Sequence, residues 1–186
     1  GRPFSKNELQ EIGASIGSDV PLFAENGPSV GYGRGERVSA FDLPELWLAL
    51  VKPTGGLSTP QVYRQYAASQ HSERRELHKV LSELGESCVA DFPEAISKQI
   101  FNRLEGPASV LWDGAGRWKE VLSSFPETLS AQMTGSGSAF FALTRSKEDA
   151  QIVVEKIRAS ASDRFGEPLR FENVFVVKTL VATGAH

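Results

Sequence analysis

Apolar side chains recur at helical spacing along several stretches of this chain. In residues 5–17, Leu9, Ile12 and Ile16 follow this spacing, and Ser5 and Glu8 are placed to form a capping box at the start of the helix. Similar stripes predict helices over residues 73–84, 93–105, 116–125 and 147–160. A shorter helix is predicted over residues 60–68, where Ser58 offers a capping hydroxyl and Pro60 suits the first turn.

Runs of β-type residues predict the strands. Residues 47–52 form an apolar run that Pro53 ends, and residues 171–180 are rich in β-branched side chains. Residues 130–143 are predicted as a strand, a loop and a second strand. Residues 28–41 contain scattered glycines and predict an irregular strand or a hairpin.

The order of these elements predicts an α+β fold for residues 45–186. One strand, several helices, two strands, a helix and a last strand are expected to form a four-stranded antiparallel sheet with helices on one face, of ferredoxin-like character. Residues 1–44 contain too few elements for a core of their own. We interpret them as the end of a preceding domain, and the start at Gly1 without an initiator methionine as the interior of a longer protein.

Composition argues against several classes of partner. Of the 186 residues, 40% are hydrophobic and 23% charged, which is ordinary for a globular protein, and the net charge is −3. No basic tract indicates a nucleic-acid partner, and no apolar run approaches the ~18 residues of a membrane span. The single cysteine, Cys88, is expected to be a small buried apolar residue, and the absence of a possible internal disulfide indicates a reducing compartment.

The loop of residues 133–138 (MTGSGS), called the glycine loop below, is the most informative feature. Two glycines alternate with small hydroxyl residues directly before an apolar run. Such a loop presents backbone N–H groups and hydroxyl donors without bulky side chains, which suits an anion such as phosphate. A hairpin turn that needs glycine for positive φ explains the same residues. For the loop in isolation both interpretations stay open.

A second patch centres on Asp19. The aspartate follows a predicted helix end, in a turn bounded by Gly17 and Pro21 and surrounded by short apolar residues. A carboxylate in this position can take a proton from a substrate hydroxyl, or orient that hydroxyl through a hydrogen bond. An Asx-turn or a helix cap is the structural alternative.

Residues 59–63 place a hydroxyl and an aromatic ring one helical turn apart. The ring of Tyr63 could stack on a planar base, whereas a position for Tyr63 and Tyr66 at the edge of the core is the structural alternative. No metal site is predicted from the histidines, which have no cysteine or carboxylate at ligand spacing: His71, His78 and His186. Neither the P-loop pattern nor the Rossmann glycine pattern is present.

Taken together, these patches resemble one family. In chain order they are residues 16–23 (IGSDVPLF), 33–36 (GRGE), 50–53 (LVKP), 58–63 (STPQVY), 102–105 (NRLE) and 133–138 (MTGSGS). This ordered set, which spans nearly the whole chain, is similar to the 4-diphosphocytidyl-2-C-methyl-D-erythritol kinases, a family of the GHMP kinase superfamily. The first patch and the glycine loop are its specific parts.

The resemblance implies phosphoryl transfer from ATP, with Mg²⁺ expected beside it, to the 2-hydroxyl of cytidine-diphosphate-linked methylerythritol, a step of non-mevalonate isoprenoid biosynthesis. It implies that Asp19 is the catalytic carboxylate that activates the acceptor hydroxyl. It also implies that Tyr63 flanks the cytosine with Thr59 and Pro60 nearby. The glycine loop would lie beside the phosphates through Thr134, Gly135, Ser136, Gly137 and Ser138.

Two departures from the family pattern limit what the resemblance carries over. Residues 102–105 match a segment that usually reads Asn-Asp-Leu-Glu, and because Arg103 departs from it we assign no role there. The family's catalytic lysine, its substrate-binding Tyr-His pair and its main glycine-rich ATP loop have no counterpart among the 186 residues.

The resemblance therefore implies the C-terminal portion of the enzyme. Residues 1–44 would be the end of its N-terminal domain and residues 45–186 its C-terminal domain, with the missing N-terminal part as the main structural partner. We expect negligible kinase activity from this chain alone, because phosphoryl transfer depends on positioning and charge neutralisation by groups that are missing. The compartment implied is the cytoplasm, or the plastid in a photosynthetic eukaryote.

Two other functions stay open. The first is another GHMP kinase, of the mevalonate or homoserine type, against which Tyr63 and the Ser-Thr-Pro sequence before it argue. The second is a non-catalytic ferredoxin-like module that binds a small ligand or a partner.

Overall fold

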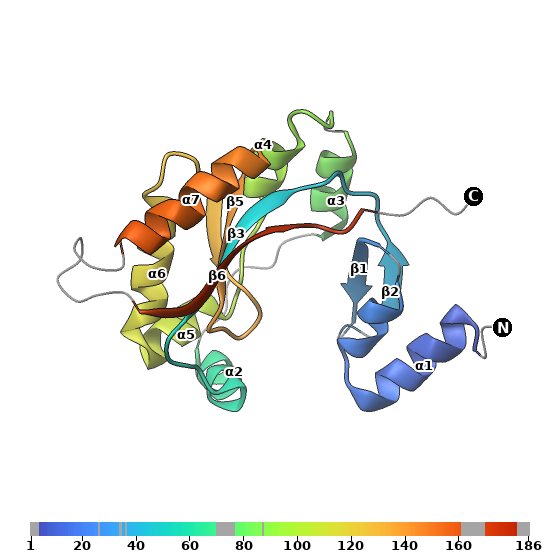
Figure 1. Cartoon of the computed structure of the whole chain (residues 1–186). Helices are drawn as coiled ribbons and strands as arrows, with labels where there is room; N and C mark the ends of the chain where they lie inside the picture. The colour runs from blue at the N-terminus through green and yellow to red at the C-terminus, as the bar shows by residue number, and fades with distance from the viewer. Residues whose placement is uncertain are drawn as a thin grey trace. The chain divides into compact units, whose positions relative to one another are not determined.

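The computed structural model describes residues 4–25, 27–33, 35, 37–69, 77–86, 88–160 and 170–181. Internal contacts divide the chain into two compact units, Gly1–Glu45 with Thr179–His186, and Leu46–Lys178 (Figure 1). The division after Glu45 lies beside the predicted boundary at residues 44 and 45, but the residues from Thr179 onward group with the first unit. That these units are parts of two kinase domains stays a prediction.

The first unit contains a helix and a hairpin. Helix α1 (Lys6–Ile16) begins with the predicted capping box, in which the Ser5 hydroxyl accepts from the backbone N–H of Glu8 and the Glu8 carboxylate accepts from the backbone N–H of Ser5. The hydrogen bonds from Ser5 hold the pKa of Glu8 below its usual value. A 3₁₀ helix, η1 (Val20–Ala24), precedes the antiparallel hairpin of β1 (Ser29–Tyr32) and β2 (Arg37–Ala40). The predicted helix and the hairpin are both confirmed.

The second unit is built on a four-stranded sheet. Its strands are β3 (Trp47–Pro53), β4 (Ser130–Met133), β5 (Phe140–Thr144) and β6 (Phe171–Lys178), in the spatial order β4-β5-β3-β6. Every neighbouring pair is antiparallel, and β5 separates β4 from β3 (Figure 1). The helices that connect the strands are α2 (Thr59–Ala68), α3 (Leu77–Gly85), α4 (Phe92–Ser97), α5 (Glu105–Leu111), α6 (Asp113–Ser123) and α7 (Lys147–Ser160). The α+β fold and its antiparallel sheet are confirmed.

Alternation along the strands directs one face of the sheet into the core. Ala49 and Val51 of β3 are fully buried, and Phe140 and Ala142 lie opposite them on β5. Helices α6 and α7 supply the other side of this core, through the stripes predicted from the sequence: Trp118, Val121 and Leu122, and Val153, Val154 and Ile157. The ring of Trp118 meets that of Phe171 edge to face, with 6.3 Å between the ring centroids.

The helix predicted over residues 93–105 is wrong. Helix α4 ends at Ser97, and α5 begins only at Glu105. Between them the side-chain oxygen of Asn102 accepts a hydrogen bond from the backbone N–H of Leu104 at 2.9 Å. Such a local side-chain bond offers the backbone an alternative to the helix, so the four-residue apolar repeat does not continue as one.

The structure also bears on three smaller predictions, which concern the cap of α2, the burial of Cys88 and the start of α3. Ser58 occupies the N-cap position of α2, but its hydroxyl makes no capping bond. Cys88 is exposed rather than buried, and its thiol donates to the carboxylate of Asp91 at 2.9 Å. The first residues of the helix predicted over 73–84 lie outside the described residues, and α3 begins at Leu77.

Candidate functional site

The glycine loop joins β4 to β5 as a tight hairpin connection. The backbone N–H of Thr134 donates to the carbonyl of Ala139 at 2.9 Å, and that of Gly137 donates to the carbonyl of Thr134 at 3.0 Å. Both glycines adopt positive φ, +55° at Gly135 and +87° at Gly137. The hairpin alternative is therefore confirmed as local geometry, and it is compatible with anion binding, because tight turns also expose backbone N–H groups.

The two glycines of the loop have different surroundings. A Cβ atom on Gly137 would lie 2.7 Å from Sδ of Met133 and 2.9 Å from Cδ1 of Leu57, so the loop packs closely against its neighbours there. A Cβ atom on Gly135 would meet nothing within 4 Å. The loop is thus closed on the Gly137 side and open at Gly135.

Two backbone donors remain available at the open side. Within the described part of the chain, no group accepts a hydrogen bond from the backbone N–H of Gly135 or of Ser136. Residues 134 and 135 are exposed, and Ser136 is half-buried. Adjacent free N–H groups in a turn form the concave arrangement that holds anions in many proteins.

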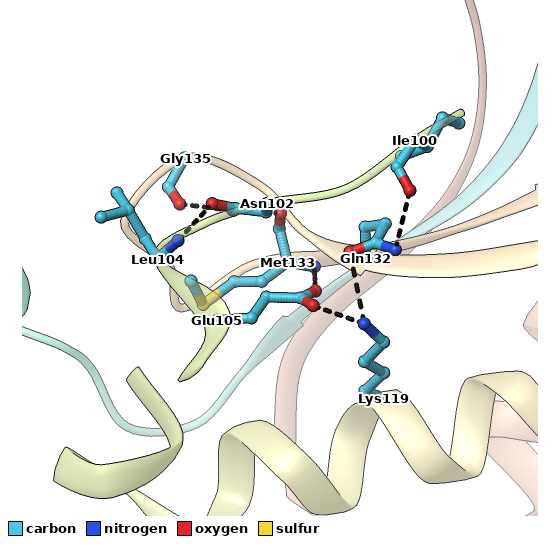
Figure 2. A network of polar contacts seen from close by, with 8 residues as sticks. All are labelled: Ile100, Asn102, Leu104, Glu105, Lys119, Gln132, Met133 and Gly135. Carbon is cyan, nitrogen blue, oxygen red and sulfur yellow. Dashed lines mark hydrogen bonds and ion pairs between the residues drawn. The ribbon is translucent and has the colours of Figure 1, made fainter. Parts of the chain in front are cut away.

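Asn102, Glu105 and Lys119, called the loop brace below, hold the loop from the side of α5 and α6 (Figure 2). The side-chain amide of Asn102 donates to the carbonyls of Met133 at 2.8 Å and Gly135 at 2.7 Å. The carboxylate of Glu105 accepts from the backbone N–H of Met133 at 2.6 Å and forms an ion pair with Lys119 of α6. The brace connects β4 and the glycine loop to the helices of the core.

Lys52 near the end of β3 and Gly55 just after this strand hold the other end of the loop. The ammonium of Lys52 donates to the hydroxyl of Ser138 at 2.9 Å, and that hydroxyl donates to the carbonyl of Gly55 at 3.0 Å. Ser138 is only 5% exposed, so these bonds satisfy a buried hydroxyl. In the sequence, Lys52 is only one residue of the matched patch 50–53, with no role assigned to it.

The structure brings the start of α2 to the glycine loop. The hydroxyls of Thr59 and Ser136 lie 2.7 Å apart, although 77 residues separate them in sequence. Pro60 is exposed in the first turn of α2, and Tyr63 is 55% exposed one turn later. The ring of Tyr63 is therefore accessible to a ligand, and a position at the edge of the core stays an alternative to stacking. Four predicted elements of the site (Thr59, Pro60, Tyr63 and the glycine loop) thus belong to one region of the second unit.

Asp19 lies in the first unit, at the N-cap position of η1. Its side chain makes no capping bond, so the helix-cap alternative is wrong, and the residue is exposed. The hairpin turn of the first unit packs against it: a Cβ atom on Gly35 would lie 2.8 Å from the carbonyl oxygen of Ser18 and 3.0 Å from Oδ1 of Asp19. Gly35 has φ of +113°, which together with this close approach requires glycine. Whether Asp19 and the glycine loop act on the same group stays a prediction.

The brace residues are the part of the site that sequence reasoning missed. The resemblance pointed to residues 102–105, but Arg103 departs from the family pattern, and the apolar repeat suggested an uninterrupted helix. The signal that could have found them was the match of Asn102 and Glu105 to the family segment on either side of Arg103. Lys119 gave no signal, because a lysine on a helix is usually solvated.

The described residues contain no cluster of three or more histidine, cysteine, aspartate and glutamate side chains that could hold a metal ion. Two of the histidines considered above, His71 and His186, lie outside those residues. None of the described helices has the length and apolar character needed to cross a membrane.

Comparisons with known proteins show a likeness to GHMP kinases. Residues 74–163 match the family model described as GHMP kinases C terminal. The chain is 31% identical over 156 residues to a 4-diphosphocytidyl-2-C-methyl-D-erythritol kinase of Pelotomaculum thermopropionicum, covering 83% of this chain and 53% of that protein. It is 33% identical over 160 residues to the kinase of the same name from Caulobacter vibrioides, covering 86% and 54%. The chain therefore spans about half the length of the curated relatives it matches.

Solved structures show the same relationship. A crystal structure of a 4-(cytidine 5'-diphospho)-2C-methyl-D-erythritol kinase superposes with a TM-score of 0.67 at 25% identity, covering 91% of this chain and 56% of the other. A homoserine kinase from Cytophaga hutchinsonii superposes with a TM-score of 0.65 at 17% identity, covering 97% and 59%. At that identity the second likeness concerns the fold alone.

Proposed function

We propose that this chain, whose residues 74–163 match the family model of the GHMP kinase C-terminal region, serves ATP-dependent phosphorylation of a small-molecule alcohol, the 2-hydroxyl of 4-diphosphocytidyl-2-C-methyl-D-erythritol. The names of its relatives support this acceptor and its place in isoprenoid biosynthesis. The coverage of those relatives leaves about half of each without a counterpart in this comparison. The reaction is therefore proposed for the protein to which these residues contribute.

The observation that carries the proposal is the open side of the glycine loop. Gly135 and Ser136 carry adjacent N–H groups that no described residue uses, a Cβ atom on Gly135 would meet nothing within 4 Å, and the hydroxyl of Ser136 lies 2.7 Å from that of Thr59. In phosphoryl transfer the protein mainly positions the phosphates and neutralises their developing charge. The proposed role of the loop is to bind phosphate oxygens of ATP or of the acceptor's diphosphate.

The other proposed roles follow the resemblance. Asp19 would accept the proton of the acceptor hydroxyl, a task for which an exposed carboxylate without a capping bond is available. Tyr63 would stack on the cytosine, with Thr59 and Pro60 beside it, and its exposure supports this role.

ATP fits the donor set of the loop, which consists of backbone N–H groups and hydroxyls. The described part of the chain contains no group of three or more His, Cys, Asp and Glu side chains that could hold Mg²⁺, and Glu105 already serves Met133 and Lys119. We therefore expect the metal ion to arrive bound to the phosphates of ATP, where it would neutralise their charge.

We further propose that the 186-residue chain alone has negligible turnover. The resemblance finds counterparts here for the family's catalytic carboxylate and its glycine loop, but none for its catalytic lysine or its main ATP loop. Steady turnover by the purified chain at the rate of a complete GHMP kinase would contradict this.

The test joins this chain to the N-terminal half of the Pelotomaculum thermopropionicum relative and measures phosphate transfer from ATP. The chimera should phosphorylate the cytidine-linked acceptor and neither homoserine nor mevalonate. Asp19→Asn should lower kcat by about a hundredfold or more, the contribution of a general base, whereas Asp42→Asn, at an exposed aspartate of the same unit, should leave it unchanged.

Each alternative makes a different prediction for this chimera. Preference for homoserine or mevalonate would favour another GHMP kinase. A folded chimera that binds the cytidine-linked compound without transferring phosphate would favour a binding module.

A further inference from the structure

We propose that Asn102 is a positioning residue, which aims the open N–H group of Ser136 in the glycine loop at the bound phosphate. The inference rests on the proposed function, because it explains how that loop would be preorganised. Asn102 contributes no donor to the ligand in this account. It acts only through the backbone carbonyls that it holds.

Every polar group of the Asn102 side chain is used. Its nitrogen donates to the carbonyls of Met133 and Gly135, and its oxygen accepts from the backbone N–H of Leu104 at 2.9 Å (Figure 2). These partners fix the orientation of the amide, because the opposite orientation would place its oxygen against two carbonyls. All three of these hydrogen bonds are to backbone groups, two in the glycine loop and one in the turn before α5. Asn102 therefore connects the loop and the turn rigidly.

The hydrogen bond to Gly135 determines where the next N–H points. The carbonyl of Gly135 and the N–H of Ser136 belong to one planar peptide group, and in a trans peptide these two bonds point in opposite directions. Since Asn102 holds the carbonyl on its own side, the N–H of Ser136 is directed to the other side, away from the brace. This is one of the two N–H groups that no described residue uses.

The peptide group between Met133 and Thr134 follows the same pattern. The carbonyl of Met133 accepts from Asn102, and the N–H of Thr134 in the same peptide donates in the other direction to Ala139. Thus Asn102 controls the peptide groups on either side of the Thr134–Gly135 pair. A loop with two glycines has many accessible conformations, so two fixed peptide planes remove much of that freedom.

The remaining brace residues anchor this arrangement to the core. Glu105 holds the N–H of Met133 and is paired with Lys119 on α6, and its side chain is only 16% exposed. Glu105 begins α5, whose residues Pro107 and Ala108 are buried. The position of the loop is therefore fixed by its bonds to two packed helices, α5 and α6. Such support is what precise placement of hydrogen-bond donors requires.

The test uses the ¹⁵N-labelled 186-residue chain, with inorganic tripolyphosphate as the probe. In the wild type the amide signals of Gly135 and Ser136 should shift and saturate. Asn102→Asp keeps the size and the acceptor for Leu104 but replaces the nitrogen that donates both hydrogen bonds by an oxygen that repels the two carbonyls, so binding should weaken at least tenfold. Asn7→Asp adds the same charge at an exposed asparagine of α1 and should bind as the wild type does.

The outcomes separate this inference from the function on which it rests. If tripolyphosphate does not shift the amide signals of Gly135 and Ser136 in the wild type, the proposed role of the loop in phosphate binding is overturned. The inference about Asn102 then fails as well. If the wild type binds and folded Asn102→Asp binds equally well, only the positioning role is overturned. A role in stability alone would lower the melting temperature but leave the affinity of the folded chain unchanged.

A second variant covers a failure of Asn102→Asp to fold. Asn102→Ala removes both donors without adding charge, and it should weaken tripolyphosphate binding severalfold. Asn173→Ala, at an exposed asparagine of β6, is its control. Equal affinities for the two alanine variants would overturn the inference.

Discussion

Replacing the two loop glycines separately by alanine should have unequal effects on stability. Both residues have positive φ, so each alanine incurs a backbone cost of about 1–2 kcal/mol. Only at Gly137 does the new methyl group collide, with Met133 and Leu57 at 2.7 Å and 2.9 Å. Such overpacking costs about 1–3 kcal/mol, and Met133 has little room to move because it is 1% exposed.

The expected loss in the free energy of unfolding is therefore about 2–5 kcal/mol for Gly137→Ala and about 1–2 kcal/mol for Gly135→Ala. Because the backbone cost is common to both, their difference isolates the crowding. Equilibrium unfolding in urea, followed by the fluorescence of Trp47, Trp112 and Trp118 in the second unit, measures both losses. Equal losses, or a larger loss at Gly135, would refute the assignment of a closed and an open side to this loop.

Three further expectations concern other contacts. Glu105→Gln should lower the free energy of unfolding by about 1–2 kcal/mol in urea titrations, against a change within about 0.5 kcal/mol for the exposed Glu120→Gln, and equal effects would argue against the brace. The hydrogen bond from Lys156 lowers the pKa of Glu127, so this pair stabilises the fold above the ordinary pKa of a glutamate and loses its effect as the pH falls through the lowered value. Melting temperatures of the wild type and Lys156→Met should accordingly differ at neutral pH and converge in acid, and a gap independent of pH would show that the pairing is not responsible. Ser5→Ala removes half of a capping box and should cost α1 about 1 kcal/mol, seen as faster amide hydrogen exchange in that helix; unchanged exchange would show that the cap contributes little.

Regular elements could be predicted because their signals are local. The buried run of β3, the stripe of α7 and the capping box of α1 each depend on residues within a few positions of one another. The failure over residues 93–105 has a local cause as well, since the bond from Leu104 to Asn102 competes with helical hydrogen bonding. An apolar repeat indicates which side chains are buried. Because irregular segments also bury side chains, such a repeat alone does not establish a helix.

The candidate site was only partly predictable, because its residues are brought together by long-range pairing. Asn102 reaches the carbonyl of Met133 across 31 positions, and Thr59 reaches Ser136 across 77. The resemblance pointed to the glycine loop and to Thr59, which carry the N–H and hydroxyl groups proposed to bind a ligand. It assigned nothing to Asn102, whose contacts are all with backbone, and no periodicity or charge pattern indicates such a contact.

The central claim is that the open N–H groups of the glycine loop bind phosphate. Titration of ATP into the ¹⁵N-labelled chain tests it most directly. The account predicts that the amide signals of Gly135 and Ser136 shift and saturate, while the signal of Glu148, in the helix that follows the other end of β5, stays in place. Loop signals that stay in place, or an equal shift at Glu148, would contradict it.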